Sequence, residues 1–125
     1  MRQLTIMETV SFIIARAMYC EKRQSDRKAL FASGDLKQGH AATAKIETIN
    51  LARDGMAISA HQKIVAGEPC EVKFDMTVDG ATHRLSLRAT AMFCVYAGQG
   101  AYKAGLKFID MRSADDSLIS RFLAR

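Results

Sequence analysis

The chain has 125 residues, of which 49% are hydrophobic and 25% are charged. This composition excludes a disordered or fibrous chain and is typical of one globular domain. The formal net charge of +5 favours an anionic partner, although charge alone does not distinguish nucleic acid, a nucleotide and an acidic protein. The three cysteines lie too far apart for a metal site and are odd in number, so we expect reduced thiols in a cytoplasmic protein.

Residues 1–21 are predicted to form a separate N-terminal unit, an amphipathic helix over about residues 6–20. Thr5 and Glu8 match the capping box that begins many helices. Apolar residues then recur at helical spacing, at Val10, Ile13, Ile14, Ala17 and Met18. A strand is the alternative, because apolar residues also alternate over residues 10–14. The apolar stretch is too short to cross a bilayer and is closed by Arg16, so no membrane insertion is expected.

From residue 28 onward, the pattern predicts six short strands and a final helix. The strands are expected at residues 29–32, 42–49, 55–60, 68–78, 83–96 and 102–109. Asp79-Gly80 is a strong hairpin signal between two of them. Ser113 is expected to be the N-cap of the helix, because acidic residues follow it in the first turn. Six strands joined by hairpin turns indicate a small antiparallel barrel.

Two short motifs form the candidate site. Arg23 and Arg27 lie four residues apart, and residues 50–55 downstream have the sequence NLARDG. Guanidinium groups donate paired hydrogen bonds to phosphate oxygens and to the O6/N7 edge of guanine. A short polar turn can bind another base edge. Each motif has an ordinary interpretation as well, since arginines at this spacing can share a solvated helix face and Asp54-Gly55 can be a simple hairpin.

The order of these motifs resembles the signature of the PilZ family, whose members are bacterial receptors for the second messenger cyclic di-GMP. Gly105 and Phe108, in the strand before the last helix, look like the end of the family's barrel. The resemblance covers about residues 22–123. It implies a mainly β fold, in which residues 22–125 form a six-stranded antiparallel PilZ-like β-barrel, with the N-terminal helix before it and the C-terminal helix at its end.

The resemblance also implies a binding site for cyclic di-GMP. The implied ligand-binding residues are Lys22, Arg23, Arg27, Asn50, Ala52 and Gly55. The arginines would contact phosphate and guanine, Asn50 would offer its amide to a guanine edge, and Gly55 would allow a close backbone approach. Ala52 would leave room for the base. Many family members have Ser where this chain has Ala52, and the missing hydroxyl removes about 0.5–1.5 kcal/mol of hydrogen bonding at most.

We therefore expect a receptor whose arginine-rich arm becomes ordered on the ligand and signals to a protein partner. No cofactor, metal or catalytic activity is expected, because the three histidines are isolated and no catalytic triad or P-loop pattern is present. A homodimer is compatible with the sequence. One alternative is a degenerate PilZ domain that acts as a protein-interaction module without nucleotide. Another is a barrel that binds single-stranded nucleic acid, which the shortage of aromatic residues between the basic ones disfavours.

Overall fold

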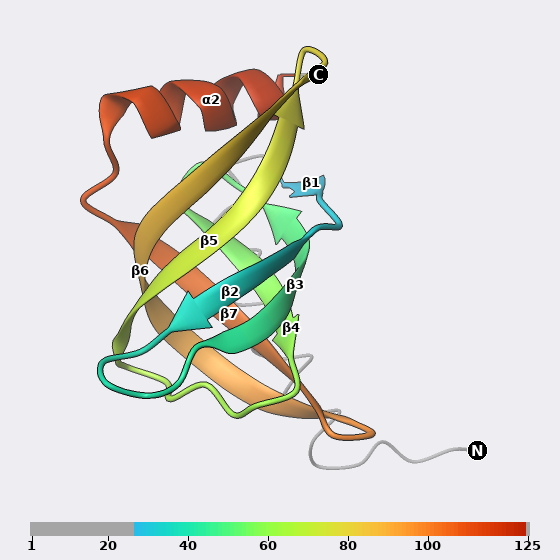
Figure 1. Cartoon of the computed structure of the whole chain (residues 1–125), viewed down its shortest axis with the longest axis vertical. Helices are drawn as coiled ribbons and strands as arrows, with labels where there is room; N and C mark the ends of the chain where they lie inside the picture. Colours follow the sequence, from blue (N-terminus) through green and yellow to red (C-terminus); the bar gives the residue numbers. More distant parts are fainter. Residues whose placement is uncertain (1–26, 125) are drawn as a thin grey trace.

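The computed structural model describes residues 27–124, which form an antiparallel β-barrel with a helix at one end (Figure 1). The strands are β1 (Lys28–Ala29), β2 (Ser33–Lys37), β3 (Ala44–Leu51), β4 (Gly55–Ala60), β5 (Pro69–Val78), β6 (Ala81–Gly98) and β7 (Ala101–Ile109). The helix is α2 (Ser113–Leu123). The helix expected over residues 6–20 lies outside the described residues, as do Lys22 and Arg23. No helix of the described part is long and apolar enough to cross a membrane.

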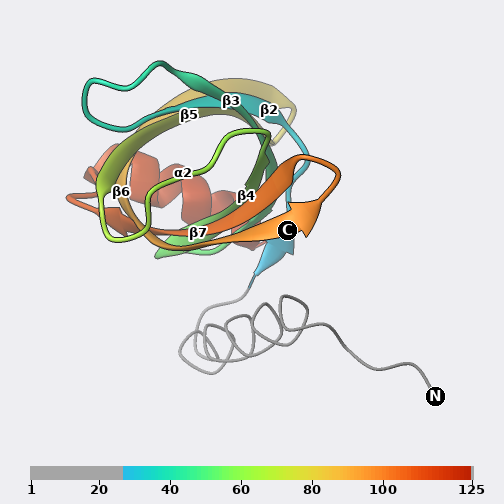
Figure 2. The same ribbon diagram turned by 90° about the horizontal axis from the view of Figure 1, so that it is seen from below.

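Six strands close into a ring, which confirms the expected six-stranded antiparallel barrel. Around the ring the order is β3, β2, β5, β6, β7 and β4, and the pairing of β4 with β3 completes it (Figure 2). Closure pairs every wall strand on both sides and leaves no long exposed edge. The short β1 adds to β3 beside β2.

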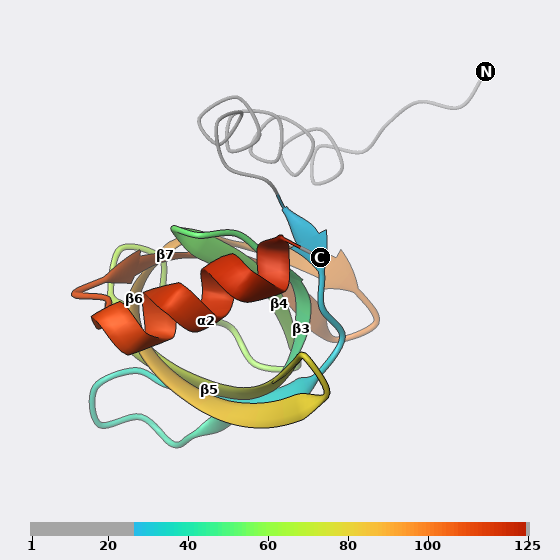
Figure 3. The same ribbon diagram turned by 90° about the horizontal axis from the view of Figure 1, so that it is seen from above.

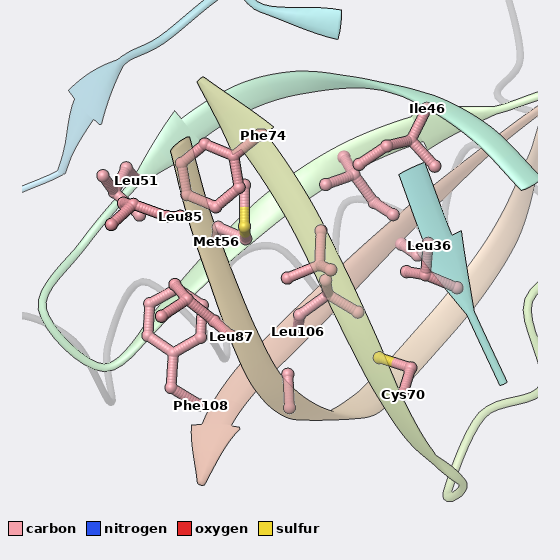
Figure 4. Packing of buried hydrophobic residues seen from close by; sticks show 14 of the residues in the cluster. Leu36, Ile46, Leu51, Met56, Cys70, Phe74, Leu85, Leu87, Leu106 and Phe108 are labelled. Atoms are coloured by element: carbon pink, nitrogen blue, oxygen red, sulfur yellow. The ribbon is translucent and has the colours of Figure 1, made fainter. Parts of the chain in front are cut away.

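The core fills the interior of the ring. β5 shows the clearest alternation, with every second residue from Cys70 to Val78 buried. Phe74 and Leu106 point into this interior from different strands and are fully buried (Figure 4). α2 lies across one end of the barrel and adds Ile119 and Phe122 to the core (Figure 3). Ile64, from the segment between β4 and β5, adds to the same core.

One predicted strand was misplaced. The sequence predicts a strand at residues 29–32, but of these only Ala29 lies in a strand. Residues 30–32 interrupt β1 and β2, which both pair with β3. β2 was missed because Gly34 and Asp35 have low strand propensity. Glycine is required at position 34 because β2 and β5 approach closely. A Cβ atom at this position would lie 2.3 Å from the carbonyl oxygen of Lys73 on β5.

The expected N-cap of the last helix was also wrong. Arg112 is the N-cap of α2, and its backbone is extended, with φ −72° and ψ 149°. Its carbonyl accepts the amide of Asp116 at 2.9 Å, and no side chain caps the helix. Ser113 is instead the first helical residue. The acidic residues of the first turn stabilise the positive end of the helix dipole, which accounts for a helix that begins without a side-chain cap.

The close contact at Gly34 gives a stability test. Gly34→Ala is expected to lower the free energy of unfolding by about 1–3 kcal/mol, because the added methyl group must push β2 away from the backbone of β5. Ser33→Ala, one residue earlier on the exposed face of the same strand, is the matched control and should change little. Urea unfolding of both variants measures the difference. Equal midpoints for Gly34→Ala and the unchanged protein would contradict this account of the β2–β5 contact.

Candidate functional site

The two motifs meet where β1 pairs with the end of β3. Ala29 lies opposite Asn50, and Lys28 lies opposite Leu51. Just before β1, Nη1 of Arg27 donates a hydrogen bond of 3.3 Å to Oδ1 of Asn50. The structure therefore brings together one residue from each predicted motif, although they are far apart in the sequence.

A buried threonine holds this pairing in place. Thr48 is only 2% exposed, and its hydroxyl donates to the carbonyl of Leu30 and accepts the amide of Ala32 at 2.8 Å. The backbone of Thr48 donates to the carbonyl of Ala32, also at 2.8 Å. These bonds satisfy the backbone of the interrupted segment between β1 and β2. The sequence does not reveal this role, because its single signal is a polar residue at an inward position of an alternating strand.

Lys28 connects β1 to the far end of α2. Its Nζ donates to the carbonyl of Phe122 at 3.1 Å and lies 4.8 Å from the centre of the Phe122 ring. A cation at a helix C-terminus is stabilised by the helix dipole and by the last carbonyl groups, and a cation over an aromatic face gains further energy. The segment that follows the arginine pair is thus attached both to the barrel wall and to the helix.

A β-bulge decides where Asn50 points. The pairing of β3 with β4 shifts between Thr48 and Asn50, so that Ile49 is the extra residue. Thr48 and Leu51 face the interior and are buried, whereas Asn50 faces outward and is only half-buried. Without the bulge, strict alternation would place Asn50 on the same inner face as Thr48. The bulge therefore presents the Asn50 amide on the outer wall beside Arg27.

Ala52 and Gly55 shape the turn between β3 and β4. The amide of Ala52 donates to the carbonyl of Gly55 at 2.8 Å, and the Ala52 side chain is only 1% exposed. A Cβ atom on Gly55 would lie 2.3 Å from the carbonyl oxygen of Leu106 on β7. The backbone carbonyl of Asp54, the residue before Gly55, accepts the amide of Phe108 at 2.9 Å. Gly55 is thus required by the packing of the turn against β7, whatever role it has toward a ligand.

Two further residues near the motifs were not predicted. Arg53 lies inside the turn and is 60% exposed; its guanidinium is 3.4 Å from Asp116. An exposed ion pair of this kind contributes little and can exchange for an anion. Phe31, in the segment between β1 and β2, is 82% exposed. The sequence predicts a strand at Phe31 and a turn at Arg53. The pairing of Leu30 with Ile49, which brings Phe31 beside the end of β3, leaves no local signal in the sequence.

This corner of the barrel is suited to bind an anion. Arg27 donates to Asn50, and Arg53 follows Asn50 by three residues in the turn. Nε of Arg27 is buried without a hydrogen-bond partner among the described residues. By contrast, the charges on the outer wall of β2, β3, β5 and β6 pair with one another. There Lys45 and Arg84 lie 3.0 and 3.4 Å from Asp35, and the hydrogen bond from Lys45 lowers the pKa of that carboxyl.

The described residues offer little for other chemistry. No group of His, Cys, Asp and Glu within residues 27–124 is arranged to hold a metal ion. Burial raises the pKa of the Cys70 thiol to about 11, which keeps it protonated and unreactive at neutral pH. The half-buried Cys94 accepts the amide of Ile64 at 3.4 Å.

The family model for the PilZ domain matches residues 21–125. No curated protein matches the chain. Among solved structures, the chain is similar to the Bacillus subtilis inhibitor of motility MotI/DgrA, with a TM-score of 0.71 and 13% identity over 83% of this chain. It spans only 50% of that protein.

Two similar structures were solved with cyclic di-GMP. The PilZ domain of YcgR from Escherichia coli has a TM-score of 0.64 and 12% identity, and the match covers 82% of this chain and 89% of that one. PlzA from Borreliella burgdorferi has a TM-score of 0.54 and 10% identity, covering 98% of this chain and 50% of that one. At such identities the likeness shows a shared fold.

The role of Thr48 is open to a direct test. Thr48→Val keeps the shape of the side chain but leaves the carbonyl of Leu30 and the amide of Ala32 without their partner. We expect a loss of about 1–3 kcal/mol in the free energy of unfolding. Amide exchange at residues 28–32 should rise more than exchange in β5. Thr77→Val, an exposed threonine bonded to Thr82 at 3.1 Å, is the control. Equal effects of the two substitutions would remove Thr48 from this role.

Proposed function

The chain belongs to the PilZ family, and we propose that it binds cyclic di-GMP and transmits this binding to a protein partner. The observation that carries the proposal is the contact between the two motifs, in which Arg27 reaches Asn50 at 3.3 Å. PilZ domains are typically non-catalytic receptor domains. Similar structures from Escherichia coli and Borreliella burgdorferi hold cyclic di-GMP, which supports the choice of ligand.

The chemistry of the corner matches the chemistry of this ligand. Cyclic di-GMP has two phosphodiesters and two guanines, and a guanidinium has five donors in a planar fork. Arg27 uses one bond toward Asn50, which leaves donors for phosphate or for the O6/N7 edge of guanine. In the proposal, Arg23 provides a second fork and Lys22 adds positive charge. Asn50 binds the other guanine edge through its outward amide.

The neighbours of the motifs complete the proposed site. Arg53 can leave its exposed pair with Asp116 and contact a phosphate. Phe31 offers an exposed aromatic face on which a guanine can stack, an interaction of about 1–3 kcal/mol per base in single-stranded nucleic acid complexes. Gly55 allows the turn to pack against β7 and so fixes the position of Asn50.

The signal is proposed to leave through β1. Binding orders the arm that contains Arg23 and Arg27, and this arm continues directly into Lys28. Because Lys28 contacts the last turn of α2, a change in the arm alters the environment of the helix end. A partner that recognises α2 or the ordered arm then distinguishes the bound state from the free state.

A second candidate is a degenerate PilZ domain that binds a protein but no nucleotide. The observation in its favour is Ala52, which stands where many family members have Ser and whose side chain is almost fully buried. The missing hydroxyl weakens binding by about 0.5–1.5 kcal/mol, a loss that the arginine contacts outweigh. We therefore place this candidate second.

Calorimetric titration with cyclic di-GMP separates the two candidates. The unchanged protein should bind, and GTP and a DNA oligonucleotide should not compete. Arg27→Ala should lose about 1.5–3 kcal/mol, which is roughly a tenfold to hundredfold loss of affinity. Arg84→Ala removes an exposed arginine from the outer wall of β6, away from the site, and should bind as before. No binding by the unchanged protein would favour the interaction module, and an unchanged Arg27→Ala affinity would remove Arg27 from the site.

Ala52 provides a second test of the same site. Ala52→Ser restores a hydroxyl to the turn and should leave the affinity for cyclic di-GMP unchanged or raise it by up to about tenfold. Because residue 52 is buried, urea unfolding of the variant must accompany the titration and should show an intact fold. A large loss of affinity in a stable Ala52→Ser protein would mean that the turn does not face the ligand.

A further inference from the structure

One row of residues crosses the outer wall of the barrel from the candidate site. Asn50 on β3 lies opposite Ala57 on β4, Ala57 lies opposite Gly105 on β7, and Gly105 lies opposite Phe93 on β6. Paired residues of neighbouring antiparallel strands point to the same face. Met56 and Ile58, on either side of Ala57, are in the core, so the row faces outward.

This outer face is apolar and withdrawn from solvent. Ala57 is only 4% exposed, although it lies outside the core cluster. Val95, the outward residue of β6 opposite Lys103, is only 7% exposed and also lies outside that cluster. Gly105 is buried as well. An outward sheet face normally carries polar residues in contact with water, so a face with these residues is built to be covered.

We propose that this face, formed by Ala57, Phe93, Val95 and Gly105, is the docking surface for residues 6–20 of the same chain. The proposal does not depend on the binding of cyclic di-GMP. The first argument is position: the row continues from Asn50 to Ala29 on β1, so the chain enters the barrel at the edge of this very face. The first described residues of the chain therefore lie at the edge of the row.

The lengths agree with this occupant. A helix over residues 6–20 is about 22 Å long, at 1.5 Å per residue. The docking surface spans β4, β7 and β6, which are two strand spacings of about 4.8 Å or roughly 10 Å, so about two turns of the helix can lie on it while Asn50 stays free. Residues 21–26 can span up to about 20 Å, which is enough to bring either end of the segment onto the face.

The side chains are complementary. The segment has an apolar stripe at helical spacing, made of Val10, Ile13, Ile14, Ala17 and Met18. Ala57 and Gly105 carry almost no side chain in the middle of the face, which leaves room for the larger residues of the stripe. On β7, Lys103 lies opposite Val95 and Lys107 lies two residues beyond Gly105, and these lysines can pair with Glu8 of the segment or with Glu21 just after it. An amphipathic helix is stabilised when its apolar stripe packs on such a face.

Hydrogen exchange of the full chain tests the docking. Amides of residues 6–20 should exchange slowly in the unchanged protein and at least about tenfold faster in Val95→Asp, because the charge disrupts the apolar face. Ser86→Asp places the same charge on an exposed outward position of β6 and should leave the segment protected. Ile13→Asp, which leaves the barrel untouched, should also abolish protection, whereas Thr9→Asp, away from the stripe, should not.

Two results would overturn the proposal. Fast exchange of residues 6–20 in the unchanged protein would show that the segment does not dock. Protection that increases with protein concentration, together with a dimer mass in light scattering, would assign the face to a second copy instead. If Val95→Asp fails to fold, the Ile13→Asp and Thr9→Asp pair decides the question alone.

Discussion

The pairing of β1 with the end of β3 is the constraint on which the candidate site depends. Two paired residues would hold such a short strand weakly, but Thr48 adds three hydrogen bonds across the interruption that follows it. Because this threonine is buried, moving β1 would leave a buried polar group without a hydrogen bond, and the protein would lose the full desolvation free energy of that group. This loss of free energy fixes the position of β1, and the position of β1 in turn fixes Arg27 beside Asn50.

The closed barrel gives this corner a rigid base. Gly34 and Gly55 each lie where a side chain would collide with a neighbouring carbonyl, so both strands approach the next one unusually closely. Lys28 then ties β1 to the last turn of α2, which itself packs on the core through Ile119 and Phe122. Lys28, which follows Arg27, is thus attached both to β3 and to α2. In our proposals, the arm, its ligand and the docked N-terminal segment all meet along the row that begins at Asn50.

Local patterns predicted the barrel but not the details that create the site. The strict alternation of β5 and the Asp79-Gly80 turn were sufficient for the hairpin of β5 and β6, since both signals are local. The position of β2 was missed because Gly34 serves a contact with a distant strand. The outward direction of Asn50 depends on a bulge that exists only in the pairing of β3 with β4. The start of α2 was misplaced because the Arg112 backbone, rather than the Ser113 side chain, begins the helix. Lys22 and Arg23 lie outside the described residues, so their roles stay predictions.

The place of binding is the central claim, and backbone NMR of the labelled protein tests it most directly. On titration with cyclic di-GMP, chemical shift changes should gather at residues 27–31 and 50–55, where β1 meets the end of β3. The outer wall around Asp35 and Arg84, where cations and acids already pair, should stay unchanged. Shift changes centred on that wall, or on the far ends of β6 and β7, would contradict the account.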